Sequence, residues 1–168
     1  MTAKAVKPQT CEPADPAPMD LLRLDLQLCF ALYASSNLMT RLYRPLLDPL
    51  GLTYPQYLAM MALWETSPQT VGALGRRLSL DSGTLTPLFK RLEAAGLVER
   101  RRDPEDERRV LIDLTQAGRD LHAKALSIPY SIMCQLPLNL DEAMALKGLL
   151  TKITDGLGEP APCAPEVG

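Results

Sequence analysis

The sequence predicts a mainly α-helical chain with one short β-hairpin between its helices. Three observations lead to this prediction. Apolar residues recur at spacings of three and four over much of the chain. N-capping residues, prolines and glycines mark where these periodic segments begin and end. Two short strand candidates, "LVERRR" and "RRVLIDL", flank the charged turn "DPEDE", as in a hairpin.

The chain is expected to form one domain, residues 21–157, between two tails. Its 168 residues suffice for one sizeable core. Residues 1–20 and 158–168 are rich in proline and poor in large apolar side chains, so a disordered or irregular N-terminal tail and a flexible C-terminal tail are expected. No apolar run is long enough to span a bilayer, and the N-terminus lacks the apolar segment of a signal peptide. We therefore expect a cytoplasmic protein without a membrane partner.

The four cysteines are expected to be reduced thiols, because a cytoplasmic location disfavours a disulfide framework. Cys11 and Cys163 lie in the tails, whereas Cys29 and Cys134 lie in predicted helices. The cysteines are far apart in sequence and there is one histidine, so no zinc-ligand spacing is present. Neither a metal nor a cofactor is expected.

The first predicted helix runs from about Asp20 to Leu42 and is apolar nearly all round, which indicates burial on several sides. Pro45 and Gly51 then interrupt the pattern. The segment "TYPQYLAMMALWET" predicts a second helix with Thr53 as its N-cap. A short helix is expected next, in "TVGALGRRL".

The segment "LDSGTLTPLFKRLEAAG" predicts an amphipathic helix over residues 82–95, with Asp81 and Ser82 as N-cap types at its start and Gly96 at its end. A short helix, a second helix and then a hairpin is the element order of a winged helix-turn-helix. The winged lobe should cover about residues 53–115. The predicted fold is thus mainly α, a winged helix-turn-helix with additional N- and C-terminal helices.

This order predicts a DNA-binding face, because the second helix of such a motif enters the major groove. Residues 72–110 hold 9 of the 18 basic residues of the chain. Arg108, near the hairpin tip, is suited to a minor groove. The alternative is a merely solvated helix face and a polar hairpin. The residues of the predicted helix that face away from its leucines are the candidate contacts: Ser82, Gly83, Thr84, Thr86, Lys90 and Arg91.

Residues 115–157 predict two more apolar-periodic helices. Together with the first helix they present more apolar surface than one winged lobe needs. We expect the surplus to form a subunit interface, and the alternative is a larger monomeric helical domain.

Cys29 lies in "LQLCFALYASSNLMTRLY", and a lone cysteine in an apolar helix is most often an inert, small apolar residue. A reactive cysteine needs its thiolate form, and no Lys, Arg or His lies within one turn. Tyrosine hydroxyls could supply the hydrogen bonds that favour a thiolate. Tyr33, one turn on, shares the face of Cys29. Tyr43 lies about 21 Å further along the axis, so it could reach only the cysteine of a second chain.

The segments "YPQYLAMMALWE" and "LDSGTLTPLFKRLEAAGLVERRRDPEDERRVLIDLT" resemble the MarR family of winged-helix repressors, including its Asp-x-Arg wing signature as Asp106 and Arg108. With "LDLQLCFALY" and "LTYPQYL", the chain resembles more closely the organic hydroperoxide sensors of that family, the OhrR branch. The resemblance covers about residues 22–157. It implies a homodimer that reads a pseudo-palindromic operator in double-stranded DNA.

The resemblance also implies roles for the cysteines and tyrosines. Cys29 would be the peroxidatic cysteine, with Tyr33, Tyr43 and Tyr54 as its hydrogen-bond donors from both subunits. Cys134 matches the resolving position of the two-cysteine kind, so a disulfide from Cys29 to Cys134 of the other subunit and release of the operator are expected on oxidation by an organic hydroperoxide.

Two alternatives from other classes stay open at this point. One is a MarR-type repressor whose dimer interface binds a small phenolic ligand, with Cys29 structural. The other is an enzyme, a thiol peroxidase, which is disfavoured because it would leave the winged element unexplained.

Overall fold

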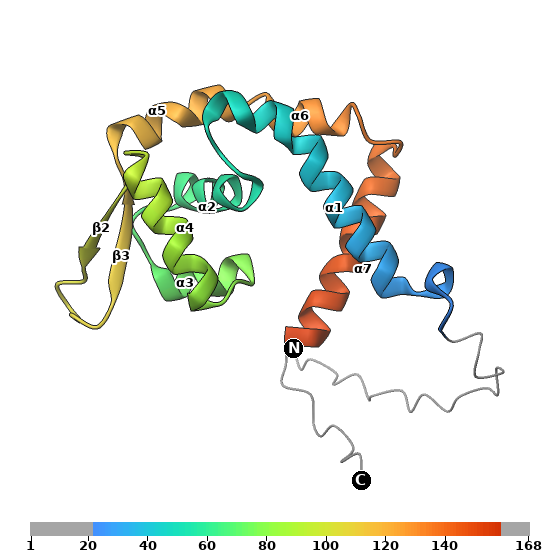
Figure 1. Cartoon of the computed structure of the whole chain (residues 1–168), viewed down its shortest axis with the longest axis horizontal. Helices are drawn as coiled ribbons and strands as arrows, with labels where there is room; N and C mark the ends of the chain where they lie inside the picture. Colours follow the sequence, from blue (N-terminus) through green and yellow to red (C-terminus); the bar gives the residue numbers. More distant parts are fainter. Residues whose placement is uncertain (1–21, 159–168) are drawn as a thin grey trace, which may run out of the picture.

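The computed structural model describes residues 22–158, and it confirms a mainly α-helical fold with a small sheet (Figure 1). The expected tails, with Cys11 and Cys163, lie outside these residues, except that Gly158 is the last residue of a helix. The elements in chain order are η2 (Leu24–Leu26), α1 (Leu28–Leu47), η3 (Asp48–Leu50), α2 (Tyr54–Glu65), β1 (Gln69–Thr70), α3 (Val71–Leu78), α4 (Ser82–Ala94), β2 (Val98–Arg102), β3 (Val110–Leu114), α5 (Gln116–Ala125), α6 (Ile128–Met133) and α7 (Leu140–Gly158).

The helices of the winged lobe begin and end at the residues that the sequence predicts. Thr53 caps α2 in a capping box with Gln56. The side chain of Asp81 accepts a hydrogen bond from the backbone N–H of Thr84 at the start of α4. Gly96 follows α4 with a φ of +70°, a conformation that glycine adopts without steric cost. Local capping chemistry therefore sets these boundaries.

The wing is part of a three-stranded antiparallel sheet in the order β1-β3-β2, not the two-stranded ribbon that the sequence predicts. The predicted strands are present as β2 and β3. The third strand, β1, pairs Gln69 with Ile112 and Thr70 with Leu111. It escapes prediction because two residues are too few to show a strand periodicity.

One apolar core lies inside the winged lobe. Its largest fully buried side chains are Phe89, Leu47, Met60, Leu63 and Leu74. The core joins α2, α3 and α4 to the sheet and is closed by α5 and α6. This packing holds α4 and the wing in a defined relation to each other.

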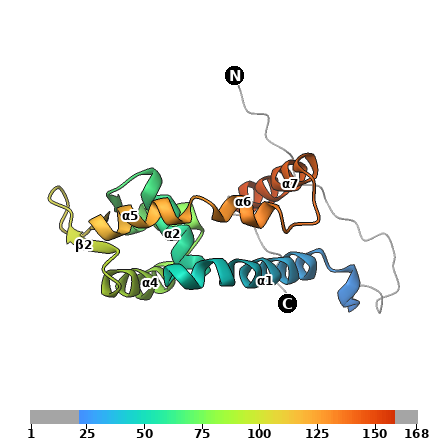
Figure 2. The same ribbon diagram turned by 90° about the horizontal axis from the view of Figure 1, so that it is seen from above.

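The first helix differs from its prediction in position and in burial. It runs from Leu28 to Leu47 and continues through Pro45, so it begins and ends later than expected. In this single chain Leu47 is its only buried residue, although burial on several sides is expected from the sequence. The N-terminal two thirds of α1 project away from the lobe like an arm (Figures 1 and 2).

Three helices rather than the predicted two follow the wing, because a break after Ala125 separates α5 from α6. α7 overlaps α1 in Figure 1, but the view in Figure 2 shows the two apart. No side chain of α7 described by the structure is buried. None of the helices within residues 22–158 has the length and apolar character to cross a bilayer.

Candidate redox and DNA-binding sites

The candidate DNA-reading residues of α4 all lie on its exposed side. Leu85, Leu88, Phe89 and Leu92 turn inward into the core. Because they recur at helical spacing, the residues between them point outward. The exposed set comprises Ser82, Gly83, Thr84, Thr86, Lys90 and Arg91, as expected from the sequence.

The N-terminal turn of α4 is tied together by Asp81. Its carboxylate accepts hydrogen bonds from the backbone N–H and the hydroxyl of Thr84. These bonds, the backbone one foremost, hold the pKa of Asp81 below its ordinary value. A Cβ on Gly83 would lie 2.9 Å from the same carboxylate, so a larger residue here would require the Asp81 carboxylate to shift. The hydroxyl of Thr86 donates to the carbonyl of Ser82.

In the wing, Asp106 bonds to the two residues Arg108 and Arg109, and the side chain of Arg108 projects outward. Asp106 accepts a hydrogen bond from the backbone N–H of Arg108, and its carboxylate lies 3.2 Å from Arg109 Nε. The side chain of Arg108 is 96% exposed. Asp106 therefore shapes the turn, and Arg108 is the side chain in a position to reach a ligand.

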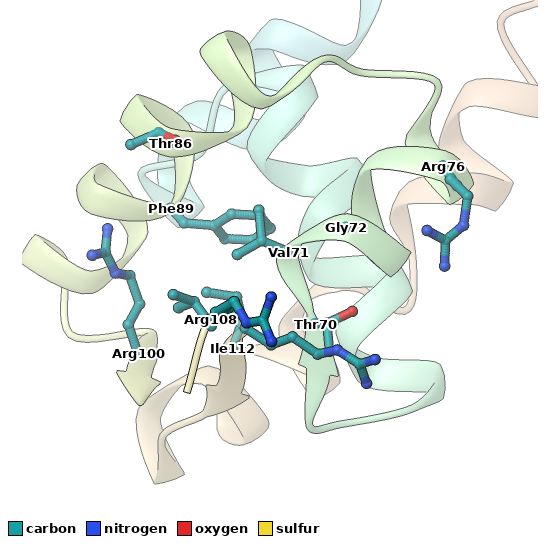
Figure 3. A pocket seen from close by; sticks show the side chains of 11 residues that line it. Thr70, Val71, Gly72, Arg76, Thr86, Phe89, Arg100, Arg108 and Ile112 are labelled. Carbon is teal, nitrogen blue, oxygen red and sulfur yellow. The ribbon is translucent and has the colours of Figure 1, made fainter. Parts of the chain in front are cut away.

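A cleft of about 600 Å³ lies between the wing, α3 and α4. Figure 3 shows Phe89 and Val71 facing each other in it, with Arg100 on one side and Arg76 on the other. Arg100 Nε is buried without a hydrogen-bond partner, although Glu93 lies 3.6 Å away. Arg76, Arg100 and Arg109 were not among the predicted contacts; clustered basic residues were their only sequence signal.

Cys29 lies in the first turn of α1 as an exposed free thiol. Tyr33 is one turn further on and is also exposed. Within residues 22–158 no hydrogen bond joins Cys29 to Tyr33 or to another side chain. One chain alone therefore does not complete the thiolate environment that the resemblance implies.

Tyr43 and Tyr54 come together at the other end of α1, with ring centroids 4.6 Å apart. Burial raises the pKa of Tyr43 to about 12, helped by its neighbours Tyr54 and Tyr57, and burial also raises the pKa of Tyr54. Both phenols thus stay protonated at neutral pH and can donate hydrogen bonds. Because α1 is continuous from Cys29 to Tyr43, about 21 Å separates this pair from its own thiol.

Tyr57 is a further member of this cluster, missed from the sequence because it resembles any core residue of an apolar helix. It is 2% exposed, and its ring centroid is 5.9 Å from that of Tyr43. On its other side it contacts Trp64 edge to face at 6.2 Å. Trp64 in turn donates a hydrogen bond to the carbonyl of Gly118 in α5. The tyrosines at the end of α1 are therefore packed directly against the winged lobe.

Cys134 is the second free thiol and follows directly after α6 as its C-cap. Its backbone N–H donates to the carbonyl of Tyr130, so the Tyr130 phenol lies one helical turn before the thiol on the same face. Hydrogen bonding of the phenol with the Cys134 side chain raises the pKa of Tyr130 above its ordinary value. Cys29 and Cys134 are not joined within this chain.

The arm helices, which are the N-terminal two thirds of α1 and the whole of α7, carry an uncovered apolar surface. Met133, Leu136, Leu146 and Leu150 line an apolar groove of about 380 Å³ between α6 and α7. Exposed large apolar side chains also line the outer part of α1 and the length of α7; they include Leu28, Phe30, Leu38, Met144, Leu149 and Leu157. Surfaces of this kind mark interaction sites.

Comparison with known proteins gives a consistent result. The model of the MarR family matches residues 52–110. The organic hydroperoxide resistance transcriptional regulator of Bacillus subtilis (strain 168) is 49% identical over 138 residues, which are 82% of this chain and 94% of that protein.

Solved structures of AbfR from Staphylococcus epidermidis have a similar fold. Reduced AbfR bound to DNA has a TM-score of 0.70 and 37% identity, over 83% of this chain and 95% of that one. A disulfide form of AbfR has a TM-score of 0.59 and 36% identity, over 83% and 96%.

Proposed function

Because the chain belongs to the MarR family and is a transcriptional regulator of that type, we propose that it is a homodimeric repressor that senses organic hydroperoxides through Cys29. One observation carries the proposal. Cys29 is exposed at the outer end of α1, while the protonated phenols suited to hold its thiolate lie at the inner end of the same helix.

DNA binding follows from the winged lobe. The exposed hydroxyls and cations of α4 would enter the major groove, and Arg108 would follow the minor groove. Arg76 and Arg100 border the cleft between these two elements, where a phosphate of the backbone can be neutralised. Two lobes in a symmetric dimer would read the two halves of a pseudo-palindrome.

A second copy would complete the redox site. If the first helices of two chains cross in opposite directions, the outer end of one lies against the inner end of the other. Tyr43 and Tyr54 of one chain then reach Cys29 of its partner, and Tyr33 adds a donor from the same helix. Donated hydrogen bonds favour the thiolate, the form that reacts with a peroxide.

The reaction consists of two displacements. The Cys29 thiolate attacks the outer oxygen of the hydroperoxide; the O–O bond breaks, the alkoxide leaves and takes up a proton, and a sulfenic acid remains. The Cys134 thiolate of the other chain then attacks that sulfur. An S–S bond forms, the S–O bond breaks, and hydroxide leaves as water after protonation.

Release of DNA follows from the geometry of a disulfide, which requires Cα atoms within about 7 Å. Forming it draws the arm helices of the two chains together. α1 is packed through Tyr43 and Tyr57 against the lobe, so movement of α1 changes the spacing of the two lobes. Half-sites on DNA lie a fixed helical turn apart, and a change of spacing costs contacts.

The test is operator binding by gel shift, with reduced and cumene hydroperoxide-treated protein, for wild type, Cys29→Ser and Cys134→Ser. We expect oxidation to abolish binding by wild type and to leave Cys29→Ser bound. Non-reducing gels should show a covalent dimer for wild type and none for either variant.

Equal binding by wild type before and after oxidation would contradict the proposal. A small phenolic ligand that releases both wild type and Cys29→Ser would favour the ligand-binding alternative. Sustained peroxide turnover with a thiol reductant would favour a peroxidase.

A further inference from the structure

We propose that Tyr130 is a positioning residue for the resolving thiol: its phenol holds the side chain of Cys134 by a hydrogen bond and directs it at the oxidised Cys29 of the partner. This inference rests on the proposed function, since it assigns a role within the second displacement. It adds a tyrosine that is separate from the three expected around Cys29.

The geometry of α6 supports the pairing. Tyr130 and Cys134 are one helical turn apart, and the backbone N–H of Cys134 donates to the carbonyl of Tyr130 over 3.0 Å. Residues four apart on a helix lie on the same face. The two side chains are therefore adjacent on the surface of the helix.

The orientation of α6 is held by its other face. Ile128 and Ile132, also four apart, are both buried in the core. Tyr130 lies about 200° around the helix from Ile128, so its face points away from the lobe. Tyr130 is 76% exposed and Cys134 is exposed. With its isoleucines anchored in the core, α6 thus presents this pair outward, where a partner chain can approach.

The phenol is suited to act as the donor. Its interaction with Cys134 raises the pKa of Tyr130 above the ordinary value near 10, so it keeps its proton at neutral pH. A protonated phenol donates to a thiolate and limits the directions in which the sulfur can point. The attack itself is the displacement described above: an S–S bond forms, the S–O bond of the sulfenic acid breaks and hydroxide leaves.

The consequence is a competition at Cys29. A sulfenic acid that is not trapped reacts with a second hydroperoxide and becomes sulfinic acid, which is not readily reversed. A well-placed Cys134 thiolate shifts the competition toward the disulfide. Loss of the phenol should therefore slow disulfide formation and increase sulfinic acid, without changing the first reaction of Cys29.

The experiment compares full-length wild type, Tyr130→Phe and Ser131→Ala after a pulse of cumene hydroperoxide. Aliquots are alkylated at intervals, run on non-reducing gels and weighed by intact mass spectrometry. Ser131→Ala is the matched control, because it removes a neighbouring hydroxyl that bonds to the carbonyl of Ser127. Sulfenic acid formation is measured separately with a dimedone probe in a Cys134→Ser background.

We expect Tyr130→Phe to form the disulfide roughly threefold to tenfold more slowly, the effect of losing one hydrogen bond of ordinary strength. The pH range in which Tyr130→Phe forms the disulfide fastest should also move upward, which loss of packing alone would not cause. Sulfenic acid formation should be unchanged, and Ser131→Ala should match wild type.

Identical rates and pH profiles for Tyr130→Phe and wild type would overturn the inference, as would an equal slowing by Ser131→Ala. A wild type that forms sulfenic acid but no disulfide would overturn both this inference and the role of Cys134. Circular dichroism checks that Tyr130→Phe is folded; a Tyr130→Leu variant with the same slow rate would support the hydroxyl over the ring.

Discussion

The winged lobe and the arm helices are built from similar apolar sequence but differ in how they bury it. In the lobe, Phe89, Leu92 and Ile112 are at most 1% exposed. In the arms, α7 has no described side chain buried and α1 has only Leu47. The lobe therefore completes its core within one chain, whereas the arms do not.

This difference indicates where the proposed second chain would pack. Exposed leucines along a whole helix are costly in water, at about 25 cal/mol for each Å² of apolar surface left uncovered. Cys29 lies in the first turn of α1, whereas Cys134 lies directly after α6, and the two thiols are not joined in one chain. The arm that lacks a core of its own thus also carries Cys29, whose proposed redox site one chain does not complete.

The largest effect, a rise in the dissociation constant of the proposed dimer, should come from placing a charge on the uncovered arm. Leu149 in α7 is 62% exposed in the single chain. If a partner covers it, Leu149→Glu buries two carboxylates per symmetric dimer, and the dissociation constant of the dimer should rise by about a thousandfold. Sedimentation equilibrium measures the change.

Asp155→Asn is the matched control, because Asp155 is exposed on the same helix and lies about 120° around it from Leu149. It should leave the dimer intact. The fluorescence of Trp64, the single tryptophan and a residue of the lobe, should remain native in Leu149→Glu. A Leu149→Glu protein that is still dimeric would contradict the proposed interface.

The second-largest effect is a loss of folding stability when the core of the lobe is opened. Phe89 is 1% exposed and joins α4 to the core. Phe89→Ala leaves a cavity, and the free energy of unfolding should fall by about 3–5 kcal/mol. Urea unfolding followed by Trp64 fluorescence measures it.

The neighbouring surface substitution Lys90→Ala should change the free energy of unfolding by no more than about 0.5 kcal/mol. Equal costs for the two substitutions would mean that the lobe does not depend on its own core.

The smallest effect lies at the junction, where Tyr43 of α1 meets the lobe. Burial raises the pKa of Tyr43 to about 12, whereas an unfolded tyrosine titrates near 10. A folded pKa above the unfolded one means that the protonated phenol stabilises the fold. This contribution is complete below pH 10 and is lost as the pH rises toward 12.

Tyr43→Phe should therefore show a weaker loss of stability than wild type between pH 10 and pH 12. Unfolding by urea at a series of pH values, together with absorbance at 295 nm, tests this. A normal titration midpoint for every tyrosine would show that the junction is open to water.

The sequence predicted the lobe far better than the arms. Asp81, Thr53 and Gly96 are local signals whose effect does not depend on distant residues, and the structure confirms all three boundaries. The short strand β1 and the passage of α1 through Pro45 were missed, because packing against other elements decides them.

The candidate sites, too, could be predicted only where local sequence decides them. The outward residues of α4 follow from helical periodicity. Arg76 and Arg100, in contrast, line the same cleft only because the wing folds back toward α3. Similarly, Tyr57 joins Tyr43 through packing between helices, which no spacing within one segment predicts.

By itself the sequence determined the helical class, the winged order and the candidate residues of the sites, since these depend on local capping, periodicity and residue chemistry. Only the tertiary structure decided which apolar faces are covered, where the phenols of Tyr43 and Tyr54 gather, and that Tyr130 accompanies Cys134 on an outward face. The physical reason is that burial and side-chain contact depend on elements distant in the chain, and here also on the surface left for a second copy.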